Sequence, residues 1–210
     1  VLYRVVRGAS PDLVVRRGAE GLLEAFLQAG EELVRDGADG LTTNCGFLSL
    51  FQAEMAAHCG VPVATSSLMQ APFIQSLLPP GRRVGILTVS AETLTSEHLA
   101  KAGVAADTPV AGTEGGREFS RVILNDETEL DVGAAEADIL EAGQRLMDEN
   151  PDLGAVLLEC TNMSPYARVL SEHLGLPVFD IHSFMTWFHA GLKPRDFGHP
   201  GSAPKLWRER

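Results

Sequence analysis

The sequence predicts an α/β protein built on parallel β-sheets. Short apolar, β-branched runs alternate along it with helix-length amphipathic runs, which is the pattern of βαβ units. One strand–turn–helix–strand unit also occurs twice, at residues 42–66 and 157–181. A chain of 210 residues with 45% hydrophobic residues can bury a good core. It suits one domain or two small α/β lobes.

The individual elements follow from these patterns. Six apolar runs have the length of strands: 38–44, 62–66, 83–90, 108–112, 153–159 and 177–181. A helix is predicted over 20–36, where Gly37 supplies the stop and one side carries Leu22, Leu23, Phe26, Leu27 and Leu33. A second long helix is predicted over 131–149, and Pro151 cannot continue it.

The segment Leu-Pro-Pro-Gly at 78–81 is the best internal boundary. Two prolines and a glycine can continue neither a helix nor a central strand. We therefore expect a first lobe of residues 1–80 together with 183–210, and a second lobe of residues 81–182. The tail from residue 193 onwards is expected to cover a surface or to contact a subunit partner, and a homo-oligomer is compatible with the sequence.

The internal repeat aligns without a gap at a constant offset of 115 residues. The first copy reads TTNCGFLSLFQAEMAAHCGVPVATS and the second LLECTNMSPYARVLSEHLGLPVFDI. The offset matches Cys45 with Cys160, Ser49 with Ser164, Phe51 with Tyr166, His58 with His173, Gly60 with Gly175, Pro62 with Pro177 and Val63 with Val178. A shared Gly-x-Pro-Val is a common helix-to-strand connection, whereas a cysteine at the same place in both copies is harder to explain by chance.

Charge and cysteine content narrow the classes of partner. A net charge of −11 argues against nucleic-acid and anionic-membrane partners, which are recognised through basic surfaces.

There is no run of 18 apolar residues and no apolar signal-peptide core, so a cytoplasmic location is expected. Three cysteines without a CxxC pair predict neither a zinc site nor a disulfide framework. The sequence starts at Val1 without methionine, and we expect an upstream piece to be missing.

Cys45 and Cys160 each follow a predicted strand and precede a predicted helix. Ligands of open α/β sheets bind beyond the carboxyl ends of the strands, so two facing lobes would bring both thiols into one cleft. A helix N-terminus favours the thiolate and can lower its pKa below about 8.5. The unpaired N–H groups of the same turn suit a substrate carboxylate.

This arrangement predicts two-base chemistry at a carbon beside a carboxylate. One thiolate would remove a proton from one face while the opposite thiol returns one to the other face. No metal or organic cofactor is expected, because the chain has no Walker loop, GxGxxG or HExxH motif. The predicted catalytic pair is Cys45 and Cys160, and the predicted substrate-binding residues are Thr43, Asn44, Gly46, Ser67, Thr88, Thr161 and Asn162.

Several neighbouring residues have two interpretations. Ser and Thr at strand-to-helix turns, such as Ser67 and Thr88, can cap a helix instead of contacting a substrate. Glu159 can tune the proton affinity of Cys160 or point away from it. His182 follows a strand and could reach the cleft, whereas Cys59 is expected to be a small buried core residue. The matched His58 and His173 are expected to act as helix C-terminal caps.

These residues resemble the aspartate/glutamate racemase superfamily of cofactor-independent amino-acid racemases and hydantoin racemases. The resemblance rests on TTNCGF, LLECTN, GVPVATSS and GLPVFDIHS and extends from about residue 20 to about residue 190. It implies two pseudo-symmetric flavodoxin-like lobes with the active site in the cleft between them. It also implies that Cys45 and Cys160 act as opposed acid and base on a small-molecule carboxylate.

The sequence departs from the glutamate racemases of this family. Those enzymes typically show Cys-Asn-Thr at the first cysteine and Cys-Thr-His at the second. Here the sequences are Cys45-Gly46-Phe47 and Cys160-Thr161-Asn162. The histidine that usually helps the second thiol is missing, and Phe47 makes the site more apolar, so glutamate is not the expected substrate. The family's early polar loop has no clear match near Val1.

Three functional hypotheses follow from the paired cysteines and the family resemblance. The first is a racemase or epimerase that inverts the α-carbon of an amino acid or related carboxylate or hydantoin, and hence an isomerase. The alternative is a cis–trans isomerase or decarboxylase of a dicarboxylic acid, in which one cysteine attacks carbon or donates a proton. The third is a two-lobed binding protein in which the thiols are incidental.

Overall fold

The computed structural model describes residues 1–198, and the expected surface-covering tail lies outside this range from residue 199 onwards. Its elements in chain order are η1 (Asp12–Arg16), α1 (Leu23–Arg35), β1 (Leu41–Thr42), η2 (Gly46–Phe51), α2 (Gln52–Cys59), β2 (Val63–Ala64), η3 (Ser67–Gln70), α3 (Ala71–Leu77), β3 (Arg83–Thr88), α4 (Ser96–Lys101), β4 (Val110–Gly112), α5 (Phe119–Leu124), α6 (Val132–Glu149), β5 (Leu153–Leu158), η4 (Thr161–Tyr166), α7 (Ala167–Leu174), β6 (Val178–Phe179) and α8 (Ile181–Leu192). Each of the six predicted strand ranges contains one of these strands, and both predicted long helices are present.

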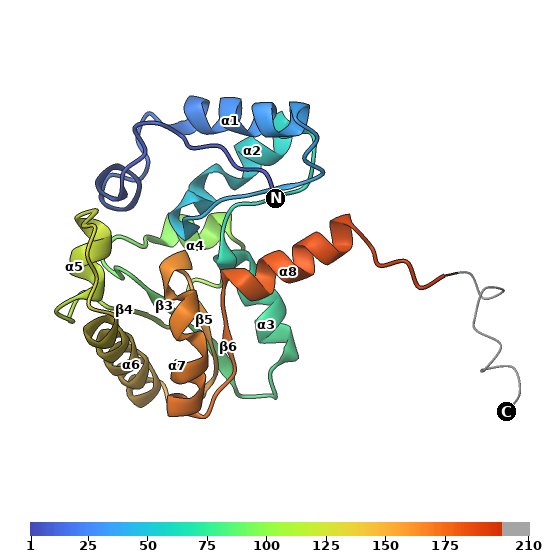
Figure 1. Ribbon diagram of the computed structural model, residues 1–210. Coiled ribbons are helices and arrows are strands. Elements are labelled where there is room, and N and C mark those ends of the chain that lie inside the picture. Colours follow the sequence, from blue (N-terminus) through green and yellow to red (C-terminus); the bar gives the residue numbers. More distant parts are fainter. Residues whose placement is uncertain (199–210) are drawn as a thin grey trace, which may run out of the picture.

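The strands form two parallel sheets, which confirms the predicted α/β class. Strands β1 and β2 pair with each other, and the larger sheet has the order β4-β3-β5-β6. Residues Ala155–Leu158 of β5 are fully buried, as expected for the centre of a parallel sheet covered on both faces. Figure 1 shows α6 and α7 on one side of this sheet and α3 on the other, while α8 extends outward from the end of β6.

The two long helices end where the sequence predicts. The Asp131 carboxylate accepts a hydrogen bond from the Ala134 N–H at 3.0 Å and caps the start of α6. At the other end of α6 the Asn150 amide donates to the Leu146 carbonyl at 2.8 Å. After α1, Gly37 adopts a φ of 98°, a left-handed conformation that ends the helix.

The internal repeat is confirmed at the level of backbone structure. Segments η2, α2 and β2 coincide with η4, α7 and β6 at the offset of 115 residues. The strand pairing repeats as well, because Leu41 lies opposite Val63 and Val156 opposite Val178. Both copies of the helix end on a glycine with a φ of 65°. The two cysteine turns are therefore built to the same plan.

A hydrogen bond crosses the predicted boundary after α3, whereas the packing of α8 on the smaller sheet lies within the first predicted lobe. Helix α3 precedes the Leu-Pro-Pro-Gly segment, yet the Gln75 side-chain oxygen accepts a hydrogen bond from the Val84 N–H on β3 at 3.0 Å. Helix α8 packs towards the smaller sheet, where a Cβ at Gly40 would lie 3.1 Å from Phe188. The division into 1–80 with 183–210 and 81–182 stays a prediction. No helix within residues 1–198 is long and apolar enough to cross a membrane.

Candidate active site

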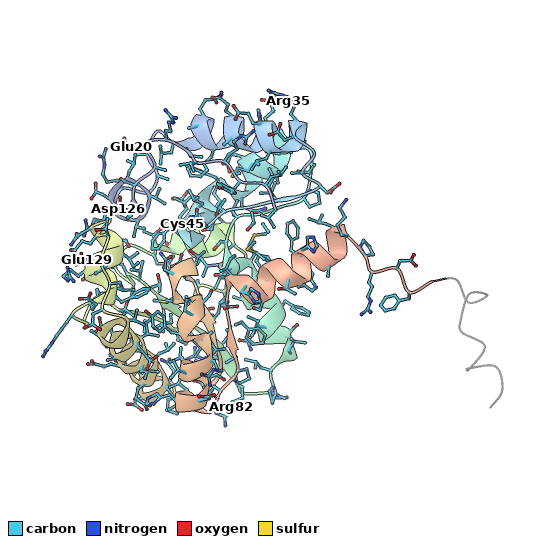
Figure 2. All side chains as sticks on the ribbon, viewed as in Figure 1. Glu20, Arg35, Cys45, Arg82, Asp126 and Glu129 are labelled. Carbon is cyan, nitrogen blue, oxygen red and sulfur yellow. The ribbon has the colours of Figure 1, made fainter. Side chains whose placement is uncertain are left out.

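A small cavity of about 190 Å³ contains both predicted catalytic thiols. It lies between the N-terminal segment, the two cysteine turns and the ends of β3 and β5. Its lining residues are Ala9, Ser10, Pro11, Val14, Val15, Phe26, Asn44, Cys45, Gly46, Phe47, Leu48, Val89, Ile123, Glu159, Cys160, Thr161 and Asn162. Figure 2 shows Cys45 where the part of the molecule carrying α1 and α2 meets the larger sheet. The structure thus brings the matched cysteines to one cavity.

The two cysteines occupy equivalent backbone positions. Each cysteine has an extended backbone and directly precedes a 3-10 turn. The φ and ψ angles are −145° and 120° at Cys45 and −73° and 127° at Cys160. The Cys45 carbonyl accepts from the Leu48 N–H at 3.1 Å, and the Cys160 carbonyl accepts from the Met163 N–H at 3.0 Å. The Phe47 N–H of the first turn approaches the Cys45 sulfur, and the Asn162 N–H of the second turn approaches the Cys160 sulfur.

The prediction that these turns lower the thiol pKa values is wrong. Burial raises the pKa of Cys45 to about 12, the Glu159 carboxylate adds to this increase, and the Phe47 N–H opposes it. Burial and Glu159 also raise the pKa of Cys160, against hydrogen bonds from the backbone of Asn162 and Met163. The backbone donors are present as predicted, but loss of hydration and a neighbouring negative charge outweigh them.

Glu159 points into the core of the site and not away from it. The residue is fully buried, and its Oε2 accepts a hydrogen bond from the Thr88 hydroxyl at 2.7 Å. Its Oε1 has no hydrogen-bond partner within the described residues. Burial raises the pKa of Glu159 to about 7, and the bond from Thr88 opposes this rise. The carboxyl group therefore titrates near neutrality beside two thiols.

Four of the seven predicted substrate-binding residues line the cavity, namely Asn44, Gly46, Thr161 and Asn162. Asn44 and Asn162 are exposed and lie at its rim. The Thr161 hydroxyl donates to the Asn44 carbonyl at 2.6 Å, which joins the two cysteine turns directly.

The structure places the other three predicted residues outside the lining. The Thr43 hydroxyl donates to the Thr65 carbonyl at 2.5 Å. Ser67 is fully buried, and its hydroxyl donates to the Leu158 carbonyl at 2.7 Å. Thr88 is fully buried against Glu159. These hydroxyls hold the strand ends and the Glu159 carboxyl in place.

The remaining candidates lie away from the cavity. Cys59 is buried in the core, as expected. His182 is exposed on α8 and does not line the cavity. His58 lies at the end of α2, where its Nε2 is 3.9 Å from a Glu31 carboxylate oxygen.

Sequence reasoning missed the apolar cover of the cavity, which comes from residues 9–15 and from Phe26, Val89 and Ile123. The Arg16 guanidinium donates to the Asn125 side chain at 3.1 Å and ties the N-terminal segment to the end of α5. The sequence signal for this cover is the Ser10-Pro11 pair, which is typical of the start of a helical segment. The Ser10 hydroxyl accepts a hydrogen bond from the Leu13 N–H at 3.2 Å at the start of η1.

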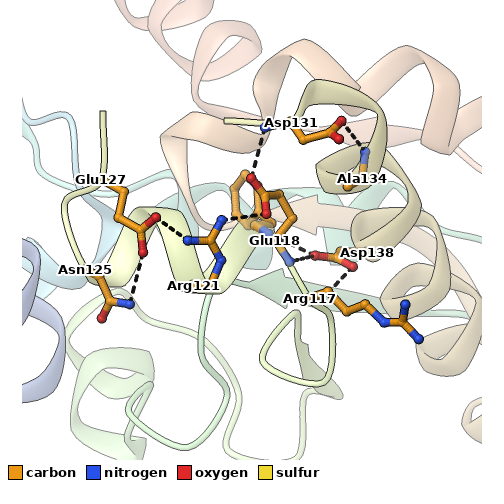
Figure 3. A network of polar contacts seen from close by, with 9 residues as sticks. Arg117, Glu118, Arg121, Asn125, Glu127, Asp131, Ala134 and Asp138 are labelled. Atoms are coloured by element: carbon orange, nitrogen blue, oxygen red, sulfur yellow. Dashed lines mark hydrogen bonds and ion pairs between the residues drawn. The ribbon is translucent and has the colours of Figure 1, made fainter. Parts of the chain in front are cut away.

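A polar network next to this cover fixes α5, which carries Ile123. The buried Asp138 carboxylate on α6 accepts hydrogen bonds from the backbone N–H groups of Arg117, Glu118 and Phe119 at 2.7–3.0 Å. Figure 3 shows these bonds together with the ion pairs that Arg121 makes. Burial alone would raise the pKa of Asp138, but the three backbone donors lower it.

Solved structures with the same fold include several enzymes. Unliganded arylmalonate decarboxylase is 16% identical, with a TM-score of 0.55, over 88% of this chain and 82% of that one. Allantoin racemase from Klebsiella pneumoniae is 20% identical, with a TM-score of 0.57, over 84% of this chain and 70% of that one. A glutamate racemase from Bacillus anthracis is 15% identical, with a TM-score of 0.56, over 89% of this chain and 70% of that one. These likenesses show the fold.

Curated relatives include dimethylsulfoniopropionate lyases. One from Durusdinium sp. clade D is 27% identical over 86% of this chain and 62% of its own length. Dimethylsulfoniopropionate lyase 3 from Emiliania huxleyi is 29% identical over 86% of this chain and 49% of its own length. The chain thus spans half to three fifths of these two relatives.

A family model described as Asp/Glu/Hydantoin racemase matches residues 67–187, more than half of the chain. The matched range contains Cys160, and its internal counterpart Cys45 lies before it. The chain belongs to the Asp/Glu/Hydantoin racemase family.

Proposed function

We propose that this protein is an enzyme in which a cysteine thiolate removes the α-proton of a small carboxylate without a cofactor. The observation that carries the proposal is the convergence of Cys45, Cys160 and Glu159 on one cavity of about 190 Å³. This volume is below the roughly 300–1,000 Å³ typical of drug-sized ligands, so it favours a small substrate.

The substrate carboxylate would be held by the cysteine turns. Their backbone N–H groups and the amides of Asn44 and Asn162 are hydrogen-bond donors at the cavity. Such fixed donors stabilise the negative charge that develops on the carboxylate when the α-proton leaves. A thiolate on either side of the α-carbon would then act as the base.

The reaction that we place first is elimination from a dialkylsulfonio carboxylate, which is the substrate class named in the curated relatives. The thiolate takes the α-proton, the C–H electron pair forms the double bond between the α- and β-carbons, and the bond from the β-carbon to sulfur breaks. The sulfur leaves as a neutral dialkyl sulfide with that electron pair. The products are dimethyl sulfide and acrylate when the substrate is dimethylsulfoniopropionate.

The walls of the cavity support this substrate class. Phe26, Phe47, Val14 and Val15 present apolar surface, and aromatic rings attract cations. A methylated sulfonium has no N–H donors to satisfy, whereas an ammonium group needs several acceptors when it leaves water. A dicarboxylic acid is less well matched, because its second carboxylate would meet Glu159.

Inversion of an α-carbon is the second candidate. The observation that favours it is the matched placement of Cys45 and Cys160 in the two copies of the repeat. Two equivalent bases on one cavity are what a reversible inversion requires, while elimination requires one base.

Headspace gas chromatography of dimethyl sulfide, released by the purified protein from dimethylsulfoniopropionate, tests the first candidate. Proton NMR of an amino-acid and hydantoin panel in D₂O tests the second through exchange of the α-hydrogen. The proposal expects one of these signals, and it expects Cys45→Ser and Cys160→Ser to lose it. A protein that gives neither signal at any substrate concentration contradicts the proposal.

A further inference from the structure

We infer that Glu159 is the residue that determines substrate specificity in this cavity, by selecting small carboxylates that also carry a positively charged group. The inference rests on the proposed function and deepens it. It starts from a buried carboxyl oxygen that has no partner in the described part of the chain.

The Glu159 side chain is held in one position. Its residue ends β5, and the Ser67 hydroxyl donates to its backbone carbonyl at 3.1 Å. The Thr88 hydroxyl on the neighbouring strand β3 occupies Oε2 at 2.7 Å. The remaining oxygen, Oε1, faces Gly46 and is the one without a partner in the described residues.

The opposite wall leaves room for this oxygen. A Cβ placed on Gly46 would overlap Glu159 Oε1 and lie 2.8 Å from the Glu159 carbonyl oxygen. Any residue larger than glycine would thus displace the carboxylate. Gly46 follows Cys45 directly, and Glu159 precedes Cys160 directly, so the carboxylate is beside both thiols.

A positively charged ligand group would have two favourable effects at Glu159. A buried polar atom without a partner is destabilising, and a cationic group would supply the missing interaction. The charge of Glu159 also raises the pKa of both thiols, so a neighbouring cation would oppose that effect and favour a thiolate. The base would then form preferentially when the right ligand is bound.

The test compares two ligands of nearly equal shape. Dimethylsulfoniopropionate carries a sulfonium, and 4-methylpentanoate places a neutral CH group at the same position. Isothermal titration calorimetry uses the Cys45→Ser/Cys160→Ser double variant, which should not consume the ligand, as the background for every Glu159 comparison. It should show roughly tenfold or more tighter binding of the sulfonium compound. Glu159→Gln should reduce this ratio to near one while it keeps the affinity for 4-methylpentanoate. Glu114→Gln is the matched control, because Glu114 is exposed and does not line the cavity.

Glu159→Asp covers the case in which the glutamine variant does not fold. It keeps the charge but shortens the reach, so it should retain a preference for the sulfonium compound that is weaker than that of the unmodified protein. A folded Glu159→Gln variant with an unchanged preference ratio overturns the inference, and so does a Glu159→Asp variant with the full ratio. This experiment measures binding, so its failure can be distinguished from failure of the proposed reaction. Selective binding without dimethyl sulfide release would contradict the elimination and leave the role of Glu159 intact.

Discussion

The Thr161 hydroxyl donates a hydrogen bond of 2.6 Å to the Asn44 carbonyl oxygen, 117 residues away in the sequence. Asn44 precedes Cys45 and Thr161 follows Cys160, so this bond links the two turns that carry the thiols. Replacement of Thr161 by valine keeps the shape and removes the donor. We expect a loss of about 1 kcal/mol in the free energy of unfolding, together with reduced turnover.

Urea denaturation and steady-state kinetics measure the two effects of Thr161→Val. Thr186→Val is the control, because Thr186 is exposed on α8 and its hydroxyl bonds within that helix. The control should keep normal turnover. Equal turnover in Thr161→Val and in the unmodified protein would show that the link between the turns is dispensable.

Alkylation of Cys45 should be slow at neutral pH in the protein without ligand. The thiolate is the reactive form, and the pKa of Cys45 is raised to about 12. The rate with iodoacetamide should therefore rise about tenfold per pH unit through the alkaline range. Glu159→Gln should speed the reaction, because removal of a negative charge lowers the pKa of the thiol. Peptide mass spectrometry gives the rates, and a plateau below pH 9 would contradict this account.

The stability of the protein should decrease with pH between about 4.5 and 7 because of Glu159. Its pKa is raised from 4.5 to about 7 in the folded state, so the folded protein retains a proton that the unfolded chain releases. The stabilising effect is fully present below pH 4.5 and is lost as the pH rises through the folded value. At one pKa unit per 1.36 kcal/mol, the change relative to Glu159→Gln amounts to about 3 kcal/mol at most. The same pH dependence of the free energy of unfolding in both proteins would contradict this prediction.

Gly46→Ala should be destabilising. The added Cβ would overlap Glu159 Oε1 and press on the Glu159 carbonyl at 2.8 Å, and overpacking of this kind costs about 1–3 kcal/mol. Gly191→Ala is a matched control, because nothing lies within 4 Å of a Cβ at that position on α8. That variant should be neutral or slightly stabilised. Thermal unfolding of both proteins distinguishes these outcomes, and similar melting temperatures would count against the close approach at Gly46.

Asp138→Asn should loosen α5 and the cavity cover. The carboxylate accepts three backbone N–H groups, and an amide cannot accept all of them, so we expect a loss of about 1–3 kcal/mol. The folded pKa of Asp138 is lowered, hence its contribution is present above the ordinary value of 3.8 and is lost as the pH falls below it. Glu141→Gln, on the exposed side of the same helix, should unfold like the unmodified protein.

The sequence pattern predicted the two cysteine turns of the site and the strands and helices around them, because these features have local signals that occur twice. The 115-residue offset places Cys45 and Cys160 at equivalent turns, and the structure reproduces that offset from strand register to terminal glycine. The predicted helices after the cysteines begin as 3-10 turns, which sequence periodicity does not distinguish from α-helix.

Features that depend on contacts between distant segments were not predictable in this way. The direction of the Glu159 side chain depends on Thr88 from another strand, and adjacent strand residues face opposite sides. The thiol pKa values were mispredicted because a dipole argument counts the local backbone and omits burial. The cover by residues 9–15 follows no periodic pattern and is fastened by Arg16 to a residue 109 positions away.

The rate of dimethyl sulfide release from dimethylsulfoniopropionate deuterated at C2 tests directly whether the cysteine thiols remove the α-proton. The unmodified protein should release dimethyl sulfide, and release from the deuterated compound should be slower than from the ordinary one. The Cys45→Ser/Cys160→Ser double variant should lose at least about 100-fold of the rate. A double variant that folds normally and keeps the full rate would show that the two thiols do not remove the proton.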